Sequence, residues 1–473
     1  MLRAVRRLSA AGAFGVMAAT VGCGWILGLD EFTDAPPATG AGGEGGGGAP
    51  ACSSPADCPG AERAAPACEE GVCGLECDTG FADCDGEPGC ETSTSTDKDN
   101  CGGCGVTCAA YCVGSICNDP VDLAVGMSHA CAILQDGSAW CWGEVPGTEP
   151  IENRTQPTQV PLPAAATRLA AGGMVLGAPP WCMGHTCALL VDGTVQCWGC
   201  NDHGQLGVGD TESAGEPRPL DLANIRQISA GGVHTCALDA DDRAFCWGNN
   251  SRGQLGDDTT TGALWPVLLS TPMEQLSAGG LHTCGVTPAG SVDCWGSNAS
   301  GQLGNGTHSD QLSPDTVLLG GVEVACGMFH TCARDAFGAY CWGHNGTGQL
   351  GLGNTVEQAS PQPLALGQID ALALSEGSPF AAAYDAHSGA LVGGELYTWG
   401  ENSHGQLGTG TAQDAFAPVK TSLTDVEQLA LGHEFSCART KARGILCWGD
   451  NSSGQLGNGT KDSTSVPTPV VWP

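Results

Sequence analysis

Residues 227–258 read QISAGGVHTCALDADDRAFCWGNNSRGQLGDD. Close variants of this stretch recur along the chain, and its Trp-Gly dipeptide begins at seven positions spaced 47–57 residues apart: Trp142, Trp198, Trp247, Trp295, Trp342, Trp399 and Trp448. In each copy, short apolar runs flank Asp/Gly turns, which is typical of strands joined by hairpins. Small antiparallel sheets that recur in this way bury one another when they are arranged radially. The repeat therefore predicts an all-β fold, a seven-bladed β-propeller.

The repeated motif AGGxHTCAL…DGxVxCWGxNxxGQLGxG resembles the repeat of the regulator of chromosome condensation family, whose propellers have seven blades. The resemblance covers residues 120–473, and six of the seven copies contain an intact GQLG, which copy one lacks. Members of this family include a chromatin-bound nucleotide exchange factor and a secreted inhibitor of β-lactamases, which act through protein contacts. The resemblance therefore implies a protein-binding module rather than an enzyme.

The two ends of the repeat region suggest how the propeller closes. Residues 121–126 match the middle of a repeat, and residues 467–472 match the part just before it. We therefore expect the last strand to complete the first blade, and we expect deletion of residues 464–473 to lower the melting temperature sharply.

Cysteines flank one hairpin in six of the copies. The pairs are Cys131 with Cys141, Cys187 with Cys197, Cys236 with Cys246, Cys284 with Cys294, Cys332 with Cys341, and Cys437 with Cys447. Residues symmetric about a hairpin turn face each other, so each pair is predicted to form a disulfide. We place Ala381 and Thr398 at the two slots in copy six, where both cysteines are absent together. A further bridge is predicted between Cys182 and Cys200, and Cys326 is predicted to be a buried free thiol.

The N-terminal region differs in composition. Residues 1–22 read as a lipoprotein-type signal peptide, with three arginines before an apolar stretch too short to span a bilayer. Small residues precede Cys23, as in a lipobox, which predicts lipidation of Cys23; ordinary signal-peptidase cleavage is the alternative. Residues 23–51 are predicted to be a Gly-rich tether. No later segment has the about 18–20 consecutive apolar residues of a transmembrane helix, so we expect membrane attachment through the lipid anchor only.

Residues 52–118 contain twelve cysteines. A segment this short buries little apolar surface, so we predict a module held together by six disulfides. Zinc binding through Cys101 and Cys104 is the alternative, but this segment contains no histidine, and no metal or cofactor is expected. Residues 77–108 resemble the Cys-rich repeats that accompany secreted proteins of myxobacteria. The predicted propeller then occupies residues 119–473.

Charge and cysteine content restrict the compartment and the partners. The chain has 473 residues, with 17 Lys plus Arg against 51 Asp plus Glu, and a net charge of −34. So few basic residues cannot neutralise the many phosphate groups of a nucleic acid or of an anionic lipid surface, which argues against both as partners. The 28 cysteines suit an oxidising compartment. We therefore expect an exported protein, an outer-membrane or cell-surface lipoprotein, or otherwise a secreted one.

The repeats also argue against a catalytic role for the histidines. One slot is occupied by histidine in five copies: His129, His185, His234, His282 and His330. A catalytic histidine is normally unique and paired with a nucleophile or carboxylate, so this recurring set is interpreted as structural. No nucleophile elbow, zinc-protease motif or phosphate loop occurs, and no catalytic residue is predicted.

Positions that vary between copies are the candidate binding residues. The residue before the histidine slot is one of them, and in copy six we place it at Ser378, with His387 in an insertion. We predict that a partner contacts the following residues: Trp181, Val233, Leu281, Phe329 and Glu434.

Together these features predict an exported, lipid-anchored, monomeric and non-enzymatic propeller that binds a protein at the cell surface. The alternatives are an extracellular hydrolase of wall or polysaccharide polymer, an inhibitor of a secreted enzyme, and a structural envelope component. Guanine nucleotide exchange is not expected, because the small GTPase partner would be cytosolic.

Overall fold

The computed structural model describes residues 53–473 except 58–62, 70–71, 83, 85–89, 91, 149–150, 175–183, 376–385 and 442–443. The predicted signal peptide, Cys23 and the tether lie outside the described residues, as do Trp181 and Cys182. Within the described ranges, no helix is long and apolar enough to cross a membrane.

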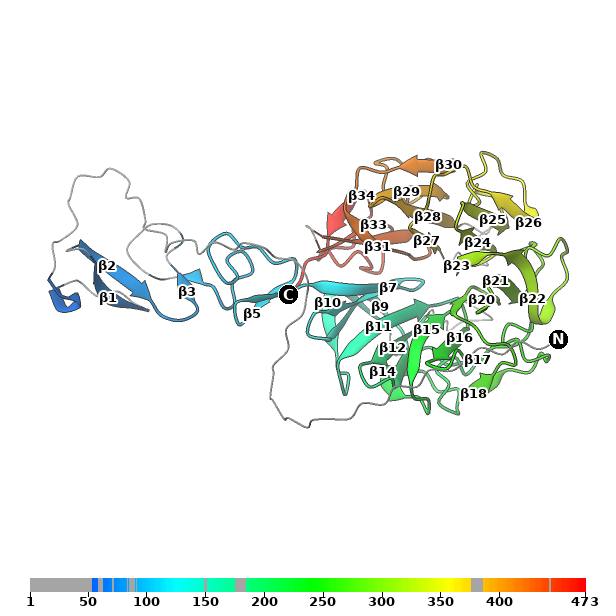
Figure 1. Cartoon of the computed structure of the whole chain (residues 1–473), viewed down its shortest axis with the longest axis horizontal. Coiled ribbons are helices and arrows are strands. Elements are labelled where there is room, and N and C mark those ends of the chain that lie inside the picture. Colours follow the sequence, from blue (N-terminus) through cyan, green and yellow to red (C-terminus); the bar gives the residue numbers. More distant parts are fainter. Residues whose placement is uncertain are drawn as a thin grey trace, which may run out of the picture.

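Seven four-stranded antiparallel sheets follow one another around a central axis, which confirms the predicted seven-bladed propeller (Figure 1). Blade one contains β7 (Pro120–Val125), β8 (His129–Leu134), β9 (Ala139–Val145) and β10 (Glu152–Val160), and blade two contains β11 (Ala166–Gly172), β12 (His185–Leu190), β13 (Val195–Gly199) and β14 (Ala214–Pro219). Blade three contains β15 (Ile225–Ala230), β16 (His234–Asp239), β17 (Ala244–Gly248) and β18 (Ala263–Leu268), and blade four contains β19 (Gln275–Ala278), β20 (His282–Val286), β21 (Ser291–Gly296) and β22 (Gln311–Leu319). Blade five contains β23 (Gly321–Cys326), β24 (His330–Asp335), β25 (Ala339–Gly343) and β26 (Gln358–Pro363), and blade six contains β27 (Ala371–Leu374), β28 (His387–Val392), β29 (Glu395–Gly400) and β30 (Ala415–Lys420). Blade seven contains β31 (Val426–Leu431), β32 (Phe435–Thr440), β33 (Gly444–Gly449) and β34 (Thr464–Pro469).

The core lies between the blades. Trp247 of blade three is fully buried in a cluster that includes Leu206 and Leu220 of blade two, and its Nε1 donates to the Gln205 carbonyl at 2.9 Å. The last glycine of each GQLG lies against the next tryptophan: Gly256 has φ +76°, and a Cβ there would lie 2.7 Å from Trp295 Nε1. The repeated CWG and GQLG motifs are thus the two halves of one interface between neighbouring blades.

The outermost strand of every blade contains a proline at an equivalent position. These residues are Pro157, Pro217, Pro266, Pro314, Pro361, Pro418 and Pro467. Proline lacks the N–H that a further strand would need for pairing, so it is tolerated on an edge and opposes the addition of another chain.

The expected closure of the ring is wrong. Strand β34 pairs with β33 of blade seven, and blade one obtains its fourth strand, β10, from its own copy. The physical reason is that residues 121–126 match an innermost strand and residues 467–472 follow the pattern of an outermost one, so the repeat region begins and ends at blade boundaries. Blades seven and one therefore meet without sharing a strand. Gln428 Nε2 donates to Asp122 Oδ1 and to the Leu123 carbonyl, both at 2.9 Å.

The structure joins the two cysteines of all six hairpin pairs, with the partners directly opposite each other in the ladder. The assignment in copy six needs correction: Thr398 faces Gly389, not Ala381, which lies outside the described residues. Both cysteines are still missing together from this blade. Cys200 is disulfide-bonded, but Cys182 lies outside the described ranges, so that pairing stays a prediction.

The Cys-rich segment projects from the side of the propeller near blade one (Figure 1). Its elements are η1 (Pro55–Asp57), β1 (Ala64–Glu69), β2 (Val72–Cys77), β3 (Phe81–Ala82), β4 (Thr92–Ser93), β5 (Tyr111–Val113) and β6 (Ile116–Asn118). Its described disulfides are Cys77–Cys90, Cys84–Cys104, Cys101–Cys112 and Cys108–Cys117. The Tyr111 ring lies 5.2 Å from that of Trp140 in blade one and 5.9 Å from that of Trp472 after β34. One aromatic cluster therefore connects this segment, the first blade and the C-terminal residues.

Candidate functional site

The axis of the propeller is a narrow channel lined by small residues of the innermost strands. A cavity of about 230 Å³ within it is bordered by side chains such as Ala124, Ala170, Ser229 and Ser277. Cys326 also borders this cavity; it is a buried free thiol, as predicted, and burial raises its pKa to about 12. A thiol held in the protonated form is a poor nucleophile.

Six histidines, not five, form a ring around the channel. Each Nε2 forms a hydrogen bond with a Thr or Ser hydroxyl of the next blade at 2.7–2.9 Å: His129 with Thr186, His185 with Thr235, His234 with Thr283, His282 with Thr331, His330 with Ser388, and His387 with Ser436. His387 therefore occupies the recurring slot rather than an insertion, and the residue before it is Ala386, not Ser378. The histidine ring is interrupted between blades seven and one, where buried Phe435 and Ala130 replace both partners.

The hydrogen bonds fix which nitrogen is protonated in five of the six ring histidines, all except His129. The Thr235 hydroxyl donates to the Gln205 carbonyl at 2.8 Å, so it accepts from His185, whose proton must lie on Nε2. The Nδ1 atoms of five ring histidines, all except His129, are buried without a hydrogen-bond partner among the described residues. Burial lowers the pKa of His234 to about 3. These imidazoles are neutral at physiological pH and connect the blades, which fits the structural role predicted for the set.

One end of the propeller, here called the loop face, is formed by the connections between the first and second strands of each blade and by the GQLG turns. The structure brings three of the predicted partner-binding residues together there. Val233 is buried in a cluster with Met174 and Met328, and Leu281 and Phe329 pack against it while partly exposed. These side chains come from four consecutive blades, so they converge near the axis.

The two other predicted binding residues are placed differently. Glu434 is not a member of this apolar cluster: its Oε1 lies 3.8 Å from both His404 Nδ1 and His433 Nε2. Trp181 lies outside the described residues.

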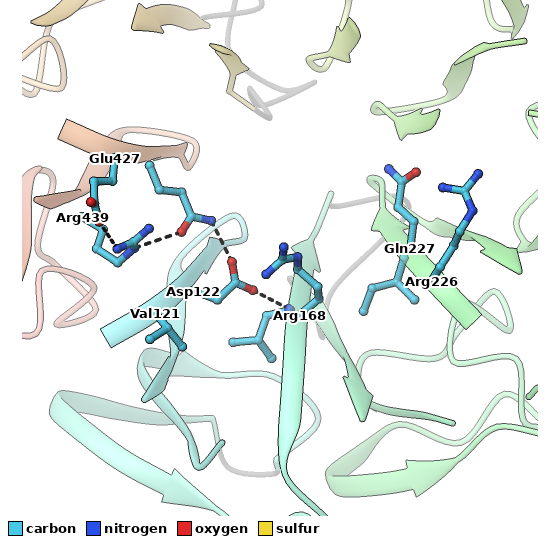
Figure 2. Close-up of a pocket in the computed structure, with 10 residues that line it drawn as sticks. Val121, Asp122, Arg168, Arg226, Gln227, Glu427 and Arg439 are labelled. Carbon is cyan, nitrogen blue, oxygen red and sulfur yellow. Dashed lines mark hydrogen bonds and ion pairs between the residues drawn. The ribbon is translucent and has the colours of Figure 1, made fainter. Parts of the chain in front are cut away.

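The opposite end, the hairpin face, is formed by the hairpins between second and third strands and contains a polar cavity of about 680 Å³ at the mouth of the channel. Figure 2 shows the residues that line it, from blades seven, one, two and three. Arg439 forms an ion pair with Glu427, and Arg226 forms one with Asp242 at 2.7 Å. Burial raises the pKa of Asp122 despite its hydrogen bonds to Gln428 and Leu169.

The sequence did not predict this cavity. The residues that line it come from different repeats. The signal in the sequence is found only when one equivalent position on the innermost strand is compared in all seven blades. This position is occupied by Asp122, Arg168, Gln227, Gln275, Glu323, Ala371 and Gln428. Six of these seven side chains are polar although they lie on the innermost strands, which points to a polar channel mouth.

Comparison with known proteins agrees with the architecture. A model of the RCC1-like domain matches residues 107–383, and models of the regulator of chromosome condensation (RCC1) repeat match residues 393–439, 444–473 and 426–455. The ultraviolet-B receptor UVR8 of Arabidopsis thaliana is 31% identical over 121 residues, which cover 24% of this chain and 25% of the receptor. The match thus spans about a quarter of that relative's length.

Solved structures show the same fold. Prp20p from Saccharomyces cerevisiae superposes with a TM-score of 0.60 at 23% identity, over 70% of this chain and 85% of that one. Human WBSCR16 gives a TM-score of 0.57 at 20% identity, over 67% of this chain and 85% of that one. At these identities the likeness concerns the fold alone.

Proposed function

Because the chain belongs to the family of RCC1-like domains, we propose that it is a non-enzymatic protein-binding module whose partner contacts the loop face. The observation that supports this most directly is the cluster of Met174, Val233 and Met328 with the partly exposed Leu281 and Phe329. Partly exposed apolar and aromatic side chains that are grouped together are typical of the core of a protein–protein interface.

Structural neighbours support the class of partner. Prp20p binds Gsp1p and histones, and a crystal structure shows yeast RCC1 (Prp20) bound to Kap60. All three partners are proteins. Guanine nucleotide exchange is not part of the proposal, because the expected export would separate this chain from a cytosolic GTPase.

We test the loop face by surface crosslinking on intact cells followed by mass spectrometry. The variant is Leu281→Asp with Phe329→Asp, which puts two charges into the apolar cluster. The matched control is Phe337→Asp, because Phe337 is 93% exposed on a hairpin of the opposite face. We expect one reproducible crosslinked protein in the parent and in the control, at least tenfold depleted in the double variant. Equal recovery from all three proteins, or loss from both variants, would reject the loop face as the binding site.

The compartment and the domain boundaries belong to the same proposal. Residues 1–22 would direct export, Cys23 would carry a lipid, residues 23–51 would tether the Cys-rich module of residues 52–118, and residues 119–473 would form a monomeric propeller at the cell surface. The disulfides support this, since such crosslinks persist in oxidising compartments. A Cys23→Ala variant should be exported yet released from the membrane fraction. If it stays in that fraction as fully as the parent does, lipid anchoring through Cys23 is wrong.

A further inference from the structure

Side chains at the channel mouth normally connect each blade to the next. Gln227 donates to the Leu276 carbonyl at 2.8 Å and accepts from the Leu276 N–H at 3.2 Å. Gln275 forms the same pair of bonds with Val324, at 2.8 and 2.9 Å. Amide and carboxylate side chains at this slot therefore bridge innermost strands.

Asp122, Glu323 and Gln428 bridge in related ways. Asp122 Oδ2 accepts from the Leu169 N–H at 2.8 Å, and Glu323 Oε1 accepts from the Leu372 N–H at 3.2 Å. Five of the seven slots thus hold a bridging residue, and the two that depart from the rule are Arg168 and Ala371.

Arg168 places a charged group at the position that a bridging side chain occupies in five other blades. Its one hydrogen bond within the described part of the chain goes to the carbonyl of the preceding Thr167, at 3.2 Å. It forms no ion pair with any described residue and is exposed. Figure 2 shows its side chain between Asp122 on one side and Gln227 and Arg226 on the other. A guanidinium group therefore replaces an inter-blade bridge and faces the cavity.

Two further guanidinium groups border the same cavity and keep unused donors. Arg226 uses Nε and Nη2 in its bonds to Asp239, Asp242 and Met273, which leaves Nη1 without a partner among the described residues. Arg439 uses Nη1 and Nε in its bonds to Glu427 and Gln428, which likewise leaves Nη2.

The charge balance of the cavity is unusual for this chain. Three arginines against two carboxyl groups, Asp122 and Glu427, line a cavity in a protein with a net charge of −34. Planar guanidinium groups match the geometry of carboxylate and phosphate and bind them through paired hydrogen bonds. The acidic surroundings repel long polyanions, whereas a small anion that fits within about 680 Å³ contacts the arginines at short range.

From this geometry we propose that the channel mouth is a binding site for a small oxyanion, a carboxylate or phosphate compound, with Arg168 as its principal ligand and Arg226 and Arg439 as flanking donors. This site lies on the face opposite the proposed protein interface and is independent of it.

The chain offers a matched variant for the test. Arg168→Gln installs the residue that the slot has in three other blades, where it bridges to the next strand, so the variant should fold and keep its melting temperature. The charge control is Arg252→Gln, which removes one surface arginine that pairs with Asp310 at 3.3 Å outside the cavity. Citrate and inorganic phosphate serve as probes in isothermal titration calorimetry at 20 and 150 mM NaCl.

We expect the parent and the Arg252→Gln protein to bind citrate, phosphate or both with equal affinity, and Arg168→Gln to bind at least tenfold more weakly. Binding of citrate alone would mark the site as selective for carboxylates, and binding of both would mark it as a general oxyanion site; either result supports the proposal. No heat from either probe with the parent at 20 mM NaCl, or equal weakening in both variants, would overturn it.

Discussion

Acidification below pH 6.5 should destabilise this propeller through the histidine ring. The pKa of five ring histidines lies near 3 and that of His129 near 4 in the folded protein, because burial opposes the imidazolium form. An exposed histidine has a pKa of about 6.5. The unfolded chain therefore binds more protons than the folded one below this value. Stability is fully present above pH 6.5 and is lost as the pH falls toward the folded pKa values.

The size of the effect follows from these pKa values. At pH 5 an unfolded histidine with a pKa of 6.5 is mostly protonated while a ring histidine is not, which costs about 2 kcal/mol per site. Six independent sites would cost about 12 kcal/mol, comparable to the whole stability of a typical domain. Glu144 opposes the trend, because burial raises its pKa to about 7, and protonation of this group in the folded state offsets about one histidine.

The assay is guanidinium unfolding at pH 7.5, 6.0 and 5.0, without reductant, followed by tryptophan fluorescence. The informative variant is His234→Gln, since the glutamine Nε2 keeps a donor for Thr283 but does not titrate. We expect its loss of unfolding free energy between pH 7.5 and 5.0 to be about 2 kcal/mol smaller than that of the parent.

The control is His308→Gln, at a histidine whose side chain is 55% exposed outside the ring. It should lose as much stability as the parent. A parent whose unfolding free energy is unchanged between pH 7.5 and 5.0, or two variants with the same reduced loss, would refute the assignment to the ring.

Three further predictions concern packing. The double variant Phe435→His with Ala130→Thr should be less destabilising than Phe435→His alone. The single variant buries an imidazole without a hydrogen-bond partner, which costs about 1–3 kcal/mol of unfolding free energy. A double-mutant cycle that shows no coupling between the two positions would contradict this. Trp472→Ala should lower stability by about 2 kcal/mol and expose Tyr111 to solvent, as measured by denaturation and by tyrosine iodination; unchanged protection of Tyr111 would mean that the aromatic cluster is not what holds the Cys-rich segment. Changing Cys236 and Cys246 together to serine should cost about 3 kcal/mol, whereas the same pair of changes at Gly389 and Thr398, where no bridge exists, should not reproduce that loss.

Much of the architecture was predictable because it repeats. The seven Trp-Gly dipeptides predicted the number of blades, and the cysteines on either side of each hairpin predicted the pairs. The closure was mispredicted because the match of residues 121–126 shows only which part of a repeat they correspond to. It does not show which sheet contains the strand that they form. His387 was misplaced for a related reason: extra residues before it in copy six shift it from the expected spacing.

The channel mouth was beyond prediction for a different reason. Its arginines, Arg168, Arg226 and Arg439, come from three copies, and only the arrangement of blades two, three and seven around one axis brings them to a single cavity. In the sequence each of them reads as an isolated surface charge. The interruption of the histidine ring was likewise invisible, because Phe435 and Ala130 are neighbours only through the contact of the last blade with the first.

The contiguity of the blades has a consequence for how such a molecule can be altered. Since each blade is one unbroken stretch of chain, no sheet depends on the two ends of the propeller being brought together by pairing. A circular permutant could join the present ends of the propeller by a linker and begin at any connection between consecutive blades. Every sheet would remain intact in such a permutant. The propeller could therefore be opened at any junction between blades, and one blade could be duplicated without changing the strand order of the others.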